Sequence, residues 1–289
     1  MMRRSAAITS GATIDALLNR GFIDHLDRLA ATRGSEYCSA EPFPHIIIDD
    51  FLPSEALDEA VRDFPTPYQL KWVEYDDTDE QKLAFPVVER LPRSLRDVLY
   101  FLNTAPALEF LEHLTGIHSL IADPYFVGGG LHQVQRGGFL GVHADFNKYE
   151  RFGLDRRVNL LLYLNHEWQE EFGGHLELWN RSMTECVKRI LPVFNRCVIF
   201  STTDYAFHGH PAPLTCPKGW TRKSIATYYY TNGRPEEELG QEHSTLFQSR
   251  TGDAARARPR RFKALKKTSR ALLPPILFDA LYYLRGRRK

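Results

Sequence analysis

The sequence predicts a mostly β protein with some α-helix. The expected fold is a double-stranded β-helix, or jelly roll, with N-terminal helices packed on one sheet and a basic, helical C-terminal tail. Three observations predict it. Apolar residues recur at helical spacing in the first third of the chain. From about Pro124, short β-rich runs alternate with Gly, Asn and Asp. After about Ala254 the composition becomes strongly basic. Several strands that follow a helical layer are typical of a barrel with one covered sheet.

Helices are expected in residues 1–122, the N-terminal helical region that we predict to pack on the barrel. Leucine and phenylalanine recur at close to helical spacing between Ile14 and Leu29. Ser54 is predicted to cap the next helix, with the acidic Asp58 near its first turn. The other two helical candidates are residues 95–102 and 108–114.

The double-stranded β-helix core is expected in residues 123–235, and residues 236–289 are expected to form the basic tail with a short helix. Runs rich in β-branched and aromatic residues, bounded by Gly, Asn or Asp, indicate the strands. These runs are residues 130–134, 139–144, 158–165, 175–179, 185–191, 197–201 and 224–231.

The two faces of the run 158–165 differ in character. Its even-numbered residues are all apolar, whereas Asn159, Tyr163 and Asn165 carry polar atoms on the other face. The apolar row should be covered by helices, and the polar row should face the barrel interior. If Arg222 faces inward from the last strand, it can meet Tyr163 inside the same barrel mouth.

A possible metal site is formed by His143, Asp145 and His208. Successive side chains of a strand alternate between faces, so His143 and Asp145 can point the same way. His208 would arrive from a distant strand, which the apolar run 197–200 supplies. Two imidazoles and one carboxylate can hold one face of an octahedral ion and leave three positions open, as in non-heme Fe(II) oxygenases.

His210 lies on the same strand face as His208 and is the other candidate for the distal ligand. We favour His208 because it follows an aromatic residue, Phe207. His210 could then line the substrate pocket, orient a metal ligand, or be an exposed loop histidine.

Arg222 opens the last strand, 14 residues after His208. A metal, a nearby buried cation and a small pocket are what a 2-oxo dicarboxylate requires. Its oxo-acid end can chelate iron, and its far carboxylate can accept a fork of hydrogen bonds from a guanidinium.

Over roughly residues 43–232, these motifs together resemble the 2-oxoglutarate/Fe(II)-dependent dioxygenases, specifically their prolyl-hydroxylase-like branch. The resemblance implies that His143, Asp145 and His208 bind iron. The family's R-x-S/A-I segment matches residues 222–225, and its G-G-x-L strand matches residues 173–176.

The resemblance also implies a set of residues that bind the cosubstrate. Arg222 would anchor 2-oxoglutarate, and Ser224 belongs to the same motif. Tyr163 matches the tyrosine of the family's Y-L-N strand, which often shares that carboxylate. The family frequently has a tyrosine ten residues before the first iron histidine; here Gln133 occupies that place and could donate a hydrogen bond instead.

The implied function is an Fe(II)- and 2-oxoglutarate-dependent dioxygenase that uses O2, with ascorbate as a further candidate cofactor. It would hydroxylate an unactivated C–H bond of a peptidyl residue such as proline, or of a small metabolite. The alternative is a catalytically silent metal-binding jelly roll whose tail contacts anionic surfaces or nucleic acid. The presence of His143, Asp145, His208 and Arg222 favours the enzyme, because a silent relative usually lacks one of them.

Composition agrees with such an enzyme and excludes several other classes. The four cysteines show no paired spacing, so neither a disulfide framework nor a zinc ribbon is indicated. No apolar stretch approaches the roughly 18 residues of a membrane span. The basic start is not followed by the apolar region of a signal peptide. We therefore expect a cytoplasmic protein without a transmembrane segment.

The tail differs from the body in charge. From Ala254 to Lys289 it has 12 basic residues and a single acidic one, Asp279. It could be an amphipathic element on an anionic membrane surface or a nucleic-acid contact. The other reading is a helix docked on the acidic body.

Overall fold

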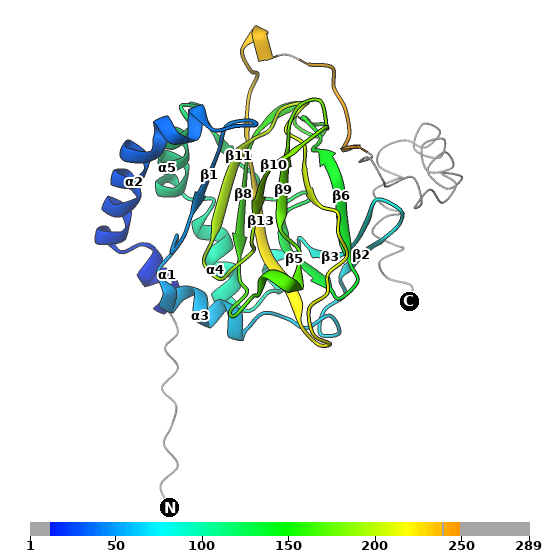
Figure 1. Cartoon of the computed structure of the whole chain (residues 1–289). Helices are drawn as coiled ribbons and strands as arrows, with labels where there is room; N and C mark the ends of the chain where they lie inside the picture. Colours follow the sequence, from blue (N-terminus) through cyan, green and yellow to red (C-terminus); the bar gives the residue numbers. More distant parts are fainter. Residues whose placement is uncertain (1–11, 239, 249–289) are drawn as a thin grey trace, which may run out of the picture. The chain divides into compact units, whose positions relative to one another are not determined.

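The computed structural model describes residues 12–238 and 240–248. Its helices are grouped near the N-terminal end, and its strands form one curled antiparallel sheet (Figure 1). The α-helices are α1 Ala12–Leu17, α2 Arg20–Ser39, α3 Ser54–Arg62, α4 Arg93–Phe101 and α5 Ala105–Thr115. The strands are β1 His45–Ile48, β2 Val73–Asp76, β3 Glu80–Phe85, β4 Ile121–Ala122, β5 Gly130–Gln135, β6 Phe139–Ala144, β7 Lys148–Tyr149, β8 Leu154–Tyr163, β9 Leu176–Trp179, β10 Cys186–Ile190, β11 Cys197–Ser201, β12 His208–His210, β13 Thr221–Thr231 and β14 Leu246–Phe247.

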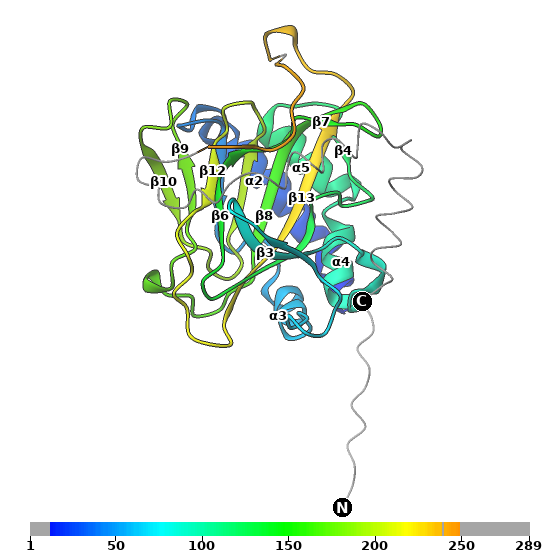
Figure 2. The same cartoon turned by 90° about the vertical axis from the view of Figure 1, so that its right-hand side faces the viewer.

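The order of strands in the sheet brings distant parts of the chain together. It runs β1-β11-β8-β13-β5-β3-β6-β12-β9-β10, and β14 pairs with β6. In Figure 2, β6, β12, β9 and β10 lie to one side of β8 and β13. The expected mostly β architecture with a helical layer is confirmed, and the fold is jelly-roll-like.

The helices cover the outer face of β8, as its apolar row predicted (Figure 1). Leu160 and Leu162 are at most 1% exposed and pack in one core with residues of every helix, among them Leu26, Leu57 and Leu95. The opposite face of β8, which carries Asn159 and Tyr163, is turned to the barrel interior. The main hydrophobic core therefore lies between the helices and the sheet. A second apolar cluster, which includes Val198 and Phe200, lines part of the interior beside Tyr163.

The N-terminal region is less helical than expected. β1 consists of His45 and three isoleucines, a β-branched run that pairs antiparallel with β11 along the sheet edge. The hairpin β2–β3 joins the sheet through β5 and β6. These strands complete the barrel that was expected from residues 123–235 alone, because the barrel needs additional strands beside β5, β6 and β11.

Two helix starts also differ from the prediction. The expected helix over residues 14–29 is interrupted at Asn19, whose side chain accepts a hydrogen bond from the Gly21 backbone N–H and starts a new helix. Ser54 is the first residue of α3 and does not cap it; Pro53 occupies the N-cap position without a side-chain hydrogen bond.

The predicted tail is only partly described. Its first residues include a 3-10 turn, Glu236–Glu238, and the strand β14, which returns to the barrel. The basic segment from Ala254 onward, with its expected helix and anionic partners, lies outside the described residues. Within residues 12–238 and 240–248, none of the helices has both the length and the apolar character that crossing a membrane requires.

Candidate active site

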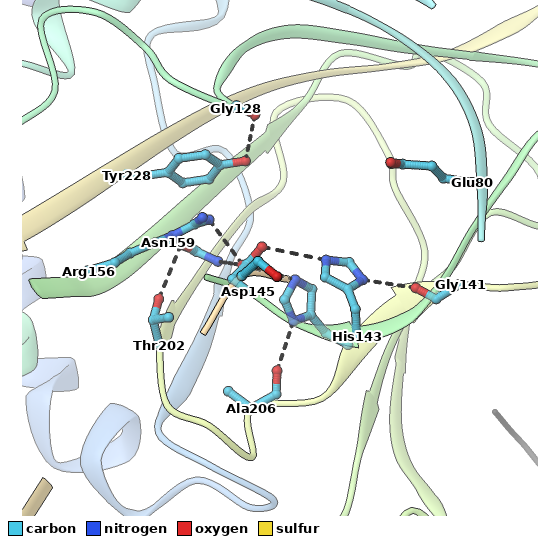
Figure 3. Close-up of polar contacts among 12 residues, drawn as sticks. Glu80, Gly128, Gly141, His143, Asp145, Arg156, Asn159, Thr202, Ala206 and Tyr228 are labelled. Atoms are coloured by element: carbon cyan, nitrogen blue, oxygen red, sulfur yellow. Dashed lines mark hydrogen bonds and ion pairs between the residues drawn. The ribbon is translucent and has the colours of Figure 1, made fainter. Parts of the chain in front are cut away.

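The structure brings His143, Asp145 and His208 together inside the barrel (Figure 3). β12 pairs antiparallel with β6 so that His208 lies opposite His143, with ring centroids 4.5 Å apart. Asp145 follows directly after β6. Its Oδ1 lies 3.5 Å from His143 Nε2 and its Oδ2 lies 3.5 Å from His208 Nε2. The three possible ligand atoms lie within 4.8 Å of one another.

The two imidazoles are held in the same way. His143 Nδ1 lies 2.9 Å from the Gly141 carbonyl oxygen, and His208 Nδ1 lies 2.9 Å from the Ala206 carbonyl oxygen. Since a carbonyl can only accept, each Nδ1 carries the proton and each Nε2 lone pair is left for a metal. Burial, reinforced by the neighbouring His143, lowers the pKa of His208 to about 4, so this ring is neutral at pH 7.

Asp145 is fixed by two side chains of β8 (Figure 3). The Asn159 amide donates to its Oδ2 at 2.6 Å, and Arg156 Nη2 donates to the same oxygen at 3.0 Å. Burial acts to raise the pKa of Asp145. The positive charge of Arg156 and the two histidines together outweigh this effect and hold that pKa well below its usual value. The carboxylate is therefore ionised and available as the anionic ligand.

Arg156 was not foreseen from the sequence. It is 1% exposed, and its guanidinium lies 3.5 Å from the centre of the Tyr228 ring. The sequence signal was hidden because a β-bulge shifts the β8–β13 register between Tyr229 and Tyr230. Simple alternation from Asn159 would turn Arg157 inward, whereas Arg157 instead pairs with Glu238 at 2.9 Å.

Arg222 and Tyr163 meet inside the barrel as expected. Arg222 Nη2 donates to Tyr163 Oη at 3.2 Å, and its Nε donates to the Gly174 carbonyl at 2.8 Å. Arg222 is 5% exposed, and among the described residues it forms no ion pair with a carboxylate. A Cβ on Gly174, which has φ +72°, would lie 2.9 Å from Arg222 Cδ, so glycine at this position makes room for the guanidinium.

Ser224 and Gln133 occupy different faces of the sheet. Ser224 is buried opposite Tyr163 and shares the inward face with Arg222. Gln133 pairs with Lys223, which lies between the inward-facing Arg222 and Ser224 and points to the opposite face. The Gln133 side chain therefore points to the outer face of the sheet. There its amide donates to the Pro65 carbonyl at 3.1 Å. This geometry argues against the predicted cofactor contact of Gln133, and we leave it out of the site.

His132 takes the inward position on β5 that the sequence analysis assigned to Gln133. It pairs with Ser224, and its Nε2 lies 3.0 Å from the Gly128 carbonyl oxygen. Burial, together with the positive charge of Lys82, lowers the pKa of His132 to about 3. No sequence pattern singles out His132, and its inward position follows only from the pairing of β5 with β13.

The hairpin β2–β3 supplies another wall of the interior. Lys82 and Glu80 share the face of Ala84, which pairs with His132. Lys82 Nζ lies 2.9 Å from Glu80 Oε2, and the side chains are only 15% and 13% exposed. Figure 3 shows Glu80 across the interior from the triad. The wall that faces the candidate metal site is therefore polar and charged.

A curled antiparallel barrel that brings together two histidines on paired strands and a carboxylate just after one of them is typical of non-heme iron oxygenases. Comparison with known families makes this specific: residues 129–230 match the 2OG-Fe(II) oxygenase superfamily. Residues 129–230 therefore match an oxygenase domain of this superfamily, and the fold of the chain is prolyl-hydroxylase-like.

Solved structures are similar to this chain at low sequence identity. One is a prolyl hydroxylase from Trichoplax adhaerens in complex with a hypoxia inducible factor oxygen degradation domain peptide fragment. It is 18% identical, and the match covers 75% of this chain and 95% of that chain with a TM-score of 0.56. A prolyl-4-hydroxylase from Pseudomonas putida is 16% identical, with 71% and 100% of the two chains covered and a TM-score of 0.49. A search of curated proteins found no significant match.

Proposed function

We propose that this dioxygenase is a hydroxylase that oxidises an unactivated C–H bond of a peptidyl residue, such as proline, or of a small metabolite. Arg222 carries the proposal. It is a buried cation that faces the same interior as the histidine–aspartate–histidine triad. Its hydrogen-bond partners are a tyrosine hydroxyl and a carbonyl, and no carboxylate of the described residues pairs with it. A buried charge without an anion is costly. The distal carboxylate of 2-oxoglutarate would supply that anion.

The donor set fits Fe(II). His143 and His208 offer neutral Nε2 atoms and Asp145 offers an ionised oxygen, within a span that one ion can bridge. The metal, when bound, supplies the oxidising chemistry with O2 and 2-oxoglutarate. The protein orients its three ligands through the Gly141 and Ala206 carbonyls and through Asn159.

The cosubstrate would be oriented by side chains of β8 and β13. Arg222 can give a forked pair of hydrogen bonds to a carboxylate, and Tyr163 Oη lies within reach of the same group. Ser224 lies opposite Tyr163 and would add a hydroxyl donor. All three side chains are at most 5% exposed, so water is excluded from the anchored end.

Two observations support the proposed substrate classes. The Trichoplax adhaerens structure contains a bound peptide, which supports a peptide substrate here. The charged hairpin residues Lys82 and Glu80 in the interior wall support a polar substrate, either peptide or metabolite. The silent metal-binding alternative is less well supported, because the ligand atoms of the triad converge and Arg222 contacts Tyr163.

The test is succinate formation from 2-oxoglutarate by purified protein with Fe(II), and with ascorbate to keep the iron reduced. Proline-containing peptides and metabolite pools are added to find a substrate that accelerates turnover. Wild-type protein should form succinate only with Fe(II), and a zinc-loaded sample is the control. Absence of succinate formation under every condition would favour the silent alternative.

The same assay tests the role of Arg222. Arg222→Ala should leave metal binding nearly intact and raise the 2-oxoglutarate concentration for half-maximal turnover strongly, because a loss on the order of 2–5 kcal/mol is typical when one partner of a buried charge pair is removed. Arg222→Lys should rescue only partly, since an ammonium lacks the forked geometry. An unchanged 2-oxoglutarate dependence in Arg222→Ala would contradict the assignment.

A further inference from the structure

His210 ends β12, two residues after the candidate ligand His208. It is 3% exposed, so it is no surface histidine of a loop. Its Nδ1 is buried and has no hydrogen-bond partner. Buried polar atoms in native proteins are nearly always paired, and an orphaned one indicates a group that binds there.

The surroundings of His210 indicate what that group is. Among the groups that act electrostatically on His210, Arg222 is the strongest, followed by Lys82 and then His143. His210 pairs with Leu140 of β6, and Leu140 pairs with Glu80 of β3, so the His210 side chain shares the interior face with the Glu80–Lys82 pair. Lys82 already pairs with Glu80, whereas Arg222 has no carboxylate partner among the described residues. A cationic region with an unpaired ring nitrogen favours an anionic oxygen ligand.

Two other roles fit the geometry less well. His210 is absent from the group of side chains whose ligand atoms converge, which consists of His143, Asp145 and His208. A purely structural histidine would have a partner for its buried nitrogen, as His45 has in the Phe43 carbonyl at 2.9 Å. His210 is buried to a similar degree without such a partner.

We propose that His210 donates its Nδ1–H to the distal carboxylate of 2-oxoglutarate, beside Arg222 and Tyr163. The inference rests on the proposed function and adds a residue to the same site. A neutral imidazole can donate from one nitrogen, so it adds a directional hydrogen bond without adding a further charge. The interaction makes His210 a specificity residue for dicarboxylic over monocarboxylic oxo acids.

The experiment measures binding without turnover. Mn(II)-loaded protein is titrated calorimetrically with 2-oxoglutarate and, separately, with 2-oxopentanoate, which has the same carbon chain but no distal carboxylate. His210→Val removes the donor, and His210→Asn places an amide N–H near the position of Nδ1. His45→Val is the matched control, because it replaces another buried histidine, on β1, whose Nδ1 already has the Phe43 carbonyl as a partner.

His210→Val should weaken 2-oxoglutarate binding by roughly 10- to 100-fold, as expected for a lost hydrogen bond to a charged group. It should leave the Kd of 2-oxopentanoate and of Mn(II) unchanged. His210→Asn should recover part of the 2-oxoglutarate affinity, and His45→Val should bind both oxo acids as the wild type does.

Three results would overturn the proposal. An unchanged 2-oxoglutarate Kd in His210→Val removes the contact. Equal weakening of both oxo acids shows that His210 shapes the pocket and does not recognise the carboxylate. Loss of Mn(II) shows that it is a metal ligand. Failure of the wild type to bind 2-oxoglutarate would instead refute the proposed function, and the inference with it.

Discussion

At the residue scale, the candidate metal site depends on hydrogen bonds that set the tautomer of each histidine. His143 and His208 both bond to a carbonyl two residues earlier in the chain, which directs both Nε2 atoms toward Asp145. Asp145 in turn receives hydrogen bonds from Asn159 and Arg156. Preorganised ligands of this kind raise metal affinity because little orientation is lost on binding.

The first residue-scale prediction distinguishes His208 from His210 as the metal ligand. We expect one Fe(II) per chain in the wild type and loss of the metal in Asp145→Ala and His208→Ala, because each change removes one of three protein ligands. His210→Ala should keep the metal. Stoichiometry is measured by elemental analysis of protein loaded anaerobically. Metal retained in His208→Ala and lost in His210→Ala would show that His210 is the ligand.

The second residue-scale prediction concerns acid stability. His132 has a folded-state pKa of about 3 against an ordinary value of 6.5. Between these values the unfolded chain binds a proton at this residue and the folded chain does not. The free energy of unfolding is therefore not reduced by His132 above pH 6.5, and it decreases as the pH falls from 6.5 toward 3. Between pH 3 and 6.5, the His132→Gln variant should therefore take up one proton fewer on unfolding than the wild type.

Urea unfolding of metal-free wild type and His132→Gln at pH 7, 6 and 5 measures this difference. The free energy of unfolding should fall less steeply with decreasing pH in the variant, while the two proteins should respond in parallel above pH 7. Parallel curves over the whole range would mean that His132 is solvated in the folded protein.

The residues also show where sequence reasoning stops. The spacing of His143 and Asp145, the position of His208 and the alternation around Tyr163 and Arg222 were sufficient to predict residues that the structure brings together. Gln133 was placed by counting from the family pattern, and the strand pairing turns it outward. Arg156 was missed because a bulge in β8–β13 is a feature of pairing that a single strand's sequence does not reveal.

At the scale of elements, β6 and β12 carry the site, and β14 pairs with the end of β6 that bears His143. Phe247 lies opposite His143, with the two rings 5.3 Å apart. The Gln248 backbone N–H donates to the Val142 carbonyl at 2.8 Å. The segment therefore completes the strand that bears the first metal ligand.

We predict that truncation after Gln248 keeps metal binding, whereas truncation after Arg234 weakens it. The shorter chain loses β14, which leaves backbone groups of β6 unpaired and removes the packing on the His143 ring. Phe247→Ala in the full chain isolates the ring contact and should have a smaller effect. Mn(II) titration with a melting curve for each variant makes the comparison. Equal affinity in both truncated proteins would show that β14 is dispensable.

Strand bounds were predicted well where the sequence alternates clearly. β6 and β11 have the expected bounds, Phe139–Ala144 and Cys197–Ser201. The hairpin β2–β3 was missed because β2 alternates over only four residues and β3 begins with three polar residues in a row. Its strand character comes from pairing with β5 and β6, which is a tertiary effect.

At the scale of the whole molecule, the two faces of one sheet have different roles in the described residues: one packs against the helices and the other carries the candidate site. The outer face of β8 packs against the helices in an apolar core. The inner face carries buried polar groups, among them Arg156, Arg222, His208 and His210. Burying so many polar groups is costly for folding, and the apolar core on the other face offsets that cost.

The central claim is that one metal ion and one 2-oxoglutarate bind in this interior, and a crystal structure with Mn(II) and 2-oxoglutarate tests it most directly. The account predicts a single anomalous peak bound by His143, Asp145 and His208, with the distal carboxylate on Arg222 and Tyr163. The nearby buried cation Arg156 should remain on Asp145. A peak elsewhere, or a cosubstrate carboxylate bound to Arg156 instead of Arg222, would contradict the account.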